Sequence, residues 1–258
     1  MLGLGTSVTN IDSGQIYKEL SELSNYADLD IHFDFSTLTG DHGDAVTDVV
    51  NTGATSISNR INSSEGTPAL DKKTLSRTCV DFPNTSDSDN ILDMAASYTT
   101  TAKAMTFFIV FQWDVAGTQI LVANADDGDD DYIKLLGGGR MGVKMSGGDA
   151  VAVQTSNTDG GTVNYTPALN KPIVYLIKRD ENGACLFFAD NNIHIATVNL
   201  EEPENFTLGA IGGTTSGSLA DFNGKICEVG IYDADIGATN VAILLESLCT
   251  KWGIDRRE

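Results

Sequence analysis

The most apolar run of the chain is MTFFIVFQW, residues 105–113. Its aromatic and β-branched residues favour a strand, and it lacks the alternation of polar residues that marks a strand with one wet face. The run therefore predicts a strand that is buried on both faces.

Shorter strands are predicted on either side of this run. Residues 29–35 alternate apolar Leu and Ile or Phe with Asp30, His32 and Asp34, the period of a half-buried strand. Hairpins are predicted at residues 132–145, around three glycines, and at residues 173–189, around an Asn-Gly turn. In all, about ten to twelve short strands separated by turns predict an antiparallel sandwich.

A helix is predicted near each end of the chain. Asp12 is a good N-cap for a helix that ends near Asn25. A second helix covers about residues 238–251, with an apolar stripe of Val241, Leu244, Leu245 and Leu248 and with Gly253 as its C-cap. We expect an N-terminal arm and amphipathic helix at residues 1–27 and one β-sandwich domain at residues 28–258.

The charge of the chain excludes several classes of partner. The 258 residues include 36 Asp and Glu but only 16 Lys and Arg, which gives a formal net charge of −20. Because nucleic acids and anionic lipids need a basic face, we expect no binding to nucleic acid or membrane. The first residues lack the basic and apolar regions of a secretion signal, and the four cysteines, without C-x-x-C spacing, are expected to be reduced and mostly buried.

Four segments resemble the concanavalin A-like lectin/glucanase superfamily, in its laminin-G-like branch. They are LDIHFDFS at residues 29–36, the region 80–92 with VDF and DSDNIL, MTFFIVF at residues 105–111, and FNGKICEVGIYD at residues 222–233 followed by the final helix and KWGI. The resemblance covers about residues 28–254 and implies an all-β antiparallel jelly-roll β-sandwich. This fold carries lectins, glycosidases, lyases and structural domains, so it does not decide the function.

The first functional hypothesis is a non-enzymatic bacteriophage virion protein. An acidic jelly roll preceded by an arm and a capped helix resembles capsid decoration (cement) proteins, which are made in the host cytoplasm and lie on the capsid surface. The N-terminal segment would bind the major capsid protein or other virion proteins, or it would instead cover the sandwich of its own chain. The chain is also a candidate for forming a homo-oligomer. The apolar residues of this segment are Leu2, Leu4, Ile16, Leu20 and Leu23.

The second hypothesis is a carbohydrate-binding module of a tail fibre or capsid surface that recognises host glycans. Sugar sites commonly place an aromatic ring beside loop Asp or Asn residues. The candidates are Tyr98, Tyr132 and Tyr165.

The acidic runs of the chain are candidates for a cation site and for an active site. The run at residues 126–131 offers oxygen ligands for Ca²⁺ through Asp126, Asp127, Asp129, Asp130 and Asp131, although a solvated turn is the alternative. No other cofactor is expected. Glycosidases of this fold carry an E-x-D-x-x-E strand, which is missing here, and the acidic side of residues 30–34 is interpreted as a solvated strand face. The sequence therefore predicts no enzyme.

Overall fold

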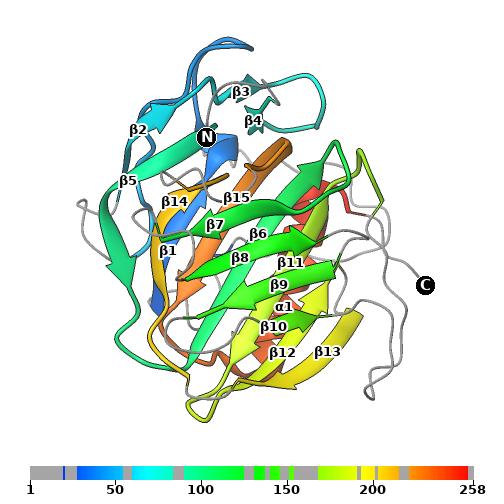
Figure 1. Ribbon diagram of the computed structural model, residues 1–258. Coiled ribbons are helices and arrows are strands. Elements are labelled where there is room, and N and C mark those ends of the chain that lie inside the picture. The colour runs from blue at the N-terminus through cyan, green and yellow to red at the C-terminus, as the bar shows by residue number, and fades with distance from the viewer. Residues whose placement is uncertain are drawn as a thin grey trace, which may run out of the picture.

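The computed structural model describes residue 20 and residues 28–54, 60–83, 90–124, 131–136, 140–145, 151–153, 168–190, 193–200, 203–214 and 221–254. Two antiparallel sheets and one long helix make up these ranges (Figure 1). Within them, no helix has the length and apolar character needed to cross a bilayer.

Sheet A has eight described strands. In spatial order it runs β13 (Ile193–Asn199), β12 (Ala184–Ala189), β11 (Ile173–Arg179), β6 (Met105–Trp113), β15 (Gly224–Tyr232), β4 (Cys79–Phe82) and β3 (Ala69–Asp71). β15 is long enough to pair with two strands on one edge: its start pairs with β4, and its second half pairs with β1 (Leu29–Asp34). Strands from both ends of the sequence are thus neighbours in the middle of this sheet.

Sheet B has seven described strands. In spatial order it runs β10 (Val151–Val153), β9 (Arg140–Lys144), β8 (Tyr132–Leu136), β7 (Gln119–Ala123), β14 (Thr207–Ile211), β5 (Ile91–Thr99) and β2 (Ile61–Glu65). The two predicted hairpins are confirmed as β8–β9 and β11–β12. Fifteen strands are described, more than the predicted ten to twelve, because very short strands such as β3 and β10 carry little sequence signal.

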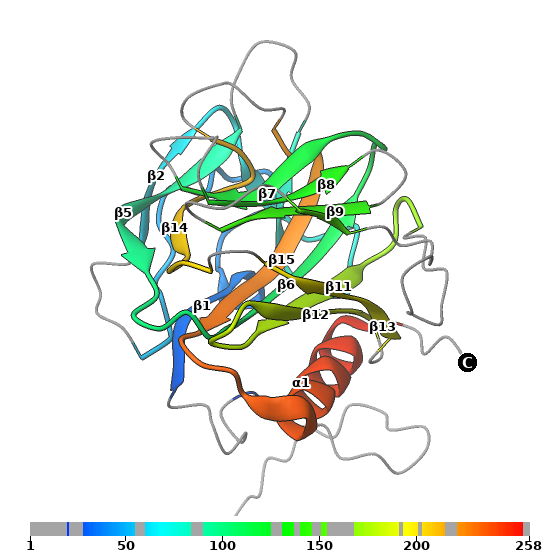
Figure 2. The same cartoon turned by 60° about the horizontal axis from the view of Figure 1, so that its bottom comes forward.

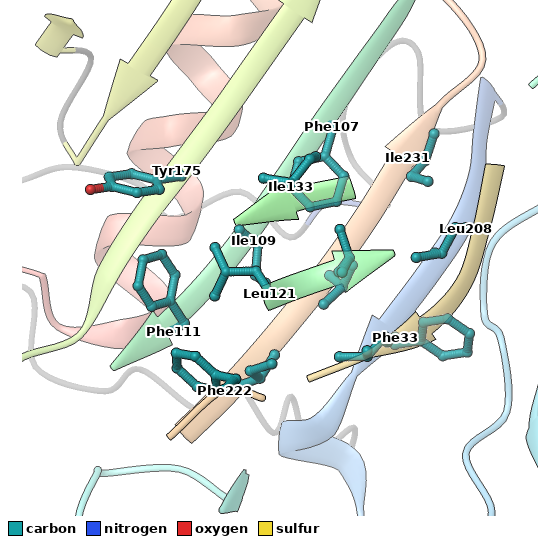
Figure 3. Close-up of a cluster of buried hydrophobic side chains, with 14 of the residues drawn as sticks. Phe33, Phe107, Ile109, Phe111, Leu121, Ile133, Tyr175, Leu208, Phe222 and Ile231 are labelled. Carbon is teal, nitrogen blue, oxygen red and sulfur yellow. The ribbon is translucent and has the colours of Figure 1, made fainter. Parts of the chain in front are cut away.

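The main core lies between the sheets, and β6 contributes to two apolar layers. All nine of its residues are buried, as the sequence predicts. Phe107, Ile109 and Phe111 point into the core toward Leu121 and Ile133 of sheet B (Figure 3). The intervening Phe108 and Val110 lie on the opposite face of sheet A, where a second apolar cluster forms.

This second cluster is covered by α1 (Gly237–Trp252), which forms a third layer against sheet A (Figure 2). The predicted apolar stripe is buried there, and Gly253 ends the helix with φ 64°, the left-handed conformation that glycine adopts without strain. A 3-10 turn, η3 (Phe35–Thr37), follows β1. The β-sandwich with a C-terminal helix is therefore confirmed, and α1 covers part of the outer face of sheet A.

Candidate functional site

A group of hydrogen-bonded polar side chains lies beneath the end of α1. Lys251 Nζ is 2.7 Å from Asp34 Oδ2 and 2.8 Å from Glu228 Oε2. Trp252 Nε1 donates to the same Glu228 oxygen at 2.7 Å. Glu228 has no exposed surface, so this carboxylate depends on the helix for two of its donors.

His32 completes the group, which we call the anchor cluster: His32, Asp34, Glu228, Lys251 and Trp252. The imidazole Nε2 lies 2.8 Å from Glu228 Oε1, and Nδ1 lies 2.9 Å from Thr52 Oγ1. Both oxygens of the buried Glu228 are therefore hydrogen-bonded, which offsets the large cost of removing a carboxylate from water.

A β-bulge gives Glu228 its position. Ile226 and Glu228 of β15 pair with the consecutive residues Phe111 and Val110 of β6, so Cys227 is the extra residue. A bulge breaks strict alternation of side chains. Ile226 accordingly lies in the inter-sheet core, whereas both Cys227 and Glu228 lie on the side that faces α1.

The anchor cluster shifts the ionisation of two of its members. Burial raises the pKa of Asp34, but the Lys251 ammonium and the Ser36 hydroxyl outweigh it and hold that pKa below its usual value. Burial likewise disfavours the charged form of Lys251, yet the carboxylates of Glu228 and Asp34 raise its pKa above the usual value. Both groups are thus held in their charged forms at neutral pH.

The same residues have the composition of a metal site. One ligand atom each of His32, Asp34 and Glu228 lie within 4.8 Å of one another. The Lys251 ammonium, however, is in direct contact with the carboxylates of Asp34 and Glu228 and already balances their negative charge. The cluster is therefore an ion-pair network that fastens α1 to β1 and β15, and a metal ion would have to displace Lys251.

Thr52, His32 and Glu228 also follow the hydroxyl–imidazole–carboxylate order of a hydrolase triad. Such a triad needs free N–H groups to stabilise an oxyanion. The backbone N–H groups of residues 52, 53 and 54 are all engaged, by His32 O, Asn51 Oδ1 and Leu29 O at 2.9, 2.9 and 2.7 Å. The local backbone thus offers no oxyanion site.

These positions differ from the sequence interpretation of residues 30–34. His32 is buried and Asp34 half-buried under α1, so the expected solvated strand face is wrong at these two residues. The sequence did not predict Glu228, Lys251 and Trp252 as partners of His32 and Asp34. Their only signal was a Glu within an otherwise apolar strand sequence and a Lys in the last turn of an apolar helix.

Of the predicted partner-binding residues, the structure describes only Leu20. It is buried in the apolar cluster between sheet A and α1, so this side chain packs against its own chain. The other members of that set, Leu2, Leu4, Ile16 and Leu23, lie outside the described residues.

The predicted glycan tyrosines are differently placed. Tyr98 is only 7 % exposed and its hydroxyl donates to Asp30 Oδ2 at 2.8 Å, so it belongs to the core and presents no ring to solvent. Tyr132 is 5 % exposed, and Lys134 Nζ lies 4.2 Å from its ring centre. Tyr165 lies outside the described residues.

Of the predicted Ca²⁺ ligands, Asp131 is described and is buried. Its Oδ2 accepts from Thr207 N at 2.7 Å, and its carbonyl accepts from Asn124 N at 2.8 Å. It therefore ties the β7–β8 connection to β14. Asp126, Asp127, Asp129 and Asp130 lie outside the described residues.

A basic patch on sheet B was not predicted. Lys134 of β8 pairs with Gly142 of β9, and Tyr132 pairs with Lys144, so these positions share the outer face of the sheet. We call Lys134 and Lys144 the basic patch, which lies in a chain of net charge −20.

The patch depends on a close approach at Gly142. A Cβ at this position would lie 3.1 Å from Cγ and 3.2 Å from Cε of Lys134. Because glycine has no side chain, the stem of Lys134 lies across β9 while its ammonium group reaches the ring of Tyr132.

Comparison with known proteins bears on the fold. No protein-family model and no curated protein matches the sequence. Among solved structures, domain 4 of AbnA, a GH43 extracellular arabinanase from Geobacillus stearothermophilus determined with arabinotriose, is similar at TM-score 0.56 and 14% identity. The match covers 84% of this chain and 98% of that domain.

Binding domains of botulinum neurotoxins are also similar. A botulinum neurotoxin type C structure, described for cell entry that depends on two ganglioside molecules, has a TM-score of 0.55 at 12% identity. A serotype D/C binding domain has a TM-score of 0.58 at 11% identity. Each match covers 87% of this chain but only 52% and 53% of the respective toxin chain. These likenesses show the fold, a β-sandwich, and the capsid role stays a prediction from the sequence.

Proposed function

We propose that this chain is a non-catalytic carbohydrate-binding module. The observation that carries the proposal is the β-sandwich, which over most of the chain is similar to a domain determined with arabinotriose and to a toxin domain described with gangliosides. Since a shared fold does not establish a shared function, a carbohydrate-binding role also requires a surface that suits such a ligand.

The outer face of sheet B is the surface we assign to the ligand. Part of the corresponding face of sheet A is covered by α1, with the anchor cluster beneath the helix end (Figure 2). On sheet B, the basic patch lies on adjacent strands, and lysine ammonium groups donate hydrogen bonds to carboxylates. Charge complementarity thus favours a saccharide that carries carboxylate groups.

Binding without cleavage is supported by the state of the clustered carboxylates. Glycosidases place two carboxyl groups on opposite sides of an accessible glycosidic bond. Asp34 and Glu228 instead share one ammonium group beneath α1, where a sugar has no access. We therefore propose no hydrolytic role for them.

A glycan array of neutral and acidic saccharides, probed with the full chain with and without Ca²⁺, tests the proposal. We expect saturable binding to carboxylate-bearing saccharides that weakens as salt is raised. The double variant Lys134→Ala/Lys144→Ala should weaken binding at least about tenfold. Lys171→Ala, which removes an exposed lysine outside the patch, is the matched control.

Two outcomes separate the parts of this proposal. Binding of neutral saccharides alone, unaffected by the double variant, would overturn the assignment to the basic patch but keep carbohydrate binding. An array that is silent under all conditions would overturn carbohydrate binding itself.

A further inference from the structure

Two cysteines lie side by side where β4 and β15 meet. The antiparallel register pairs Lys225 with Asp81 and Ile226 with Val80. Cys227 and Cys79 are the next residues along the two strands, and Cys227 is the extra residue of the β15 bulge. Directly opposed residues in antiparallel strands have Cα atoms about 4.5–5.5 Å apart, within the range of about 4.4–6.8 Å that a disulfide spans.

Their side chains point to the same side of the sheet. Val80 and Ile226 lie in the inter-sheet core, whereas Cys79 and Cys227 both lie in the apolar cluster beneath α1. Both thiols are free and fully buried. Burial and a hydrogen bond with the Cys79 thiol raise the pKa of Cys227 well above its usual value.

We propose that Cys79 and Cys227 are a redox-sensitive pair that forms a cross-strand disulfide when α1 opens. Closed, the helix keeps both thiols from solvent and disfavours the thiolate, the form that reacts. Opened, the helix exposes two thiols that neighbouring strands hold side by side. The proposal does not depend on carbohydrate binding.

The oxidant is a low-molecular-weight disulfide. One cysteine thiolate attacks it, forms a mixed disulfide and releases one small thiolate; the second cysteine thiolate then attacks the protein sulfur of that mixed disulfide and expels the other. The protein loses two thiol hydrogens and two electrons, and the small disulfide is reduced to two thiols. No other reactant is required.

The anchor cluster controls access to this pair. Glu228, which follows Cys227 directly, is bonded to Lys251 and Trp252 at the end of α1. Arg77 Nε donates to the carbonyl of Lys251 at 2.9 Å, so the helix end is also held from the β3–β4 connection. Weakening these contacts should raise the population of the open form and with it the rate of oxidation.

The test is incubation of the full chain with oxidised glutathione, followed by digestion and mass spectrometry without reduction. We expect one linked peptide pair, containing Cys79 and Cys227, an intact mass lower by two hydrogens, and full reversal by dithiothreitol. Cys79→Ser or Cys227→Ser should abolish the link. Cys185→Ser and Cys249→Ser are matched controls, because they remove other buried thiols and should preserve it.

The rate gives a second, independent readout. Lys251→Met should accelerate disulfide formation at least about tenfold while circular dichroism still reports a folded sheet. A link that joins Cys249 to either partner would overturn the pairing. Oxidation that appears only in urea sufficient to unfold the whole chain would overturn the opening of α1 as its gate.

Discussion

The ammonium group of Lys251 lies 2.8 Å from Oε2 of Glu228, a carboxylate without exposed surface. One residue is on the last turn of α1 and the other is on the central strand β15. This contact joins the helix to the sheet by charge as well as by apolar packing, and its energetics can be measured.

Lys251→Met should destabilise the fold by about 3–5 kcal/mol, because it leaves the buried Glu228 without its counter-charge. Urea unfolding followed by circular dichroism gives the free energy of unfolding. The double variant Lys251→Met/Glu228→Gln should lose less than the sum of the two single variants, since the pair is removed together. Lys171→Met on the surface is the control; an equal loss in both lysine variants would contradict the role of the ion pair.

Protonation of Asp34 should contribute to the loss of stability in acid. Its pKa is lowered in the folded state, chiefly by Lys251 against the opposing effect of burial, so its contribution is present above about pH 4 and is lost as pH falls through the lowered folded value. Asp34→Asn should therefore flatten the fall of the urea midpoint below pH 4. An unchanged acid limb in this variant would show that other carboxylates dominate.

Lys251 should contribute to the loss of stability at alkaline pH. Its folded pKa is raised, so its contribution is complete below the ordinary lysine pKa of about 10.4 and is lost as pH rises through the higher folded value. Urea midpoints measured from pH 9 to pH 12 should fall less steeply in Lys251→Met than in the native chain. Parallel curves would mean that lysine deprotonation does not drive alkaline unfolding.

Arg179 should be important although it makes no described ion pair. It is fully buried at the end of β11, where its guanidinium donates to the carbonyls of Lys103 and Glu204. Arg179→Met leaves both carbonyls short of a donor and should cost about 2–3 kcal/mol in thermal or urea unfolding. Arg60→Met, which breaks the exposed pair with Asp48, should cost under about 1 kcal/mol. Equal losses would argue against this distinction.

Gly253→Ala should cost about 1 kcal/mol, because alanine is strained at the φ of 64° that ends α1. Gly117→Ala is the comparison: no left-handed φ is required there, and the nearest atom to a Cβ would be Gln119 Nε2 at 3.9 Å. Calorimetry on the two variants should show a lower Tm only for the first.

The sequence was sufficient for features that depend on local pattern. The apolar run of β6 predicted burial on both faces, and Gly183, with φ 87°, marks the turn of the β11–β12 hairpin. The helix α1 was predicted from its apolar stripe and its terminal glycine. In each case the cause lies within a few neighbouring residues.

The candidate sites required contacts that no local pattern reveals. His32 and Glu228 are 196 positions apart, and the bulge at Cys227 turns Glu228 toward α1. Tyr98 was chosen as an aromatic platform, yet its ring fills the core. The basic patch arises only when strand register places side chains from β8 and β9 on one face.

The pairing of β1 with β15 has a consequence for synthesis on the ribosome. β1 is the first described strand, but its partner β15 is synthesised only near the end of the chain. The ion pair between Glu228 and Lys251 can form only after α1 has been synthesised. Until then, the apolar residues of β1 have no sheet to join. Completion of sheet A is thus a late event of translation, and we expect a nascent chain stalled before residue 224 to bind chaperones through its unpaired apolar strands.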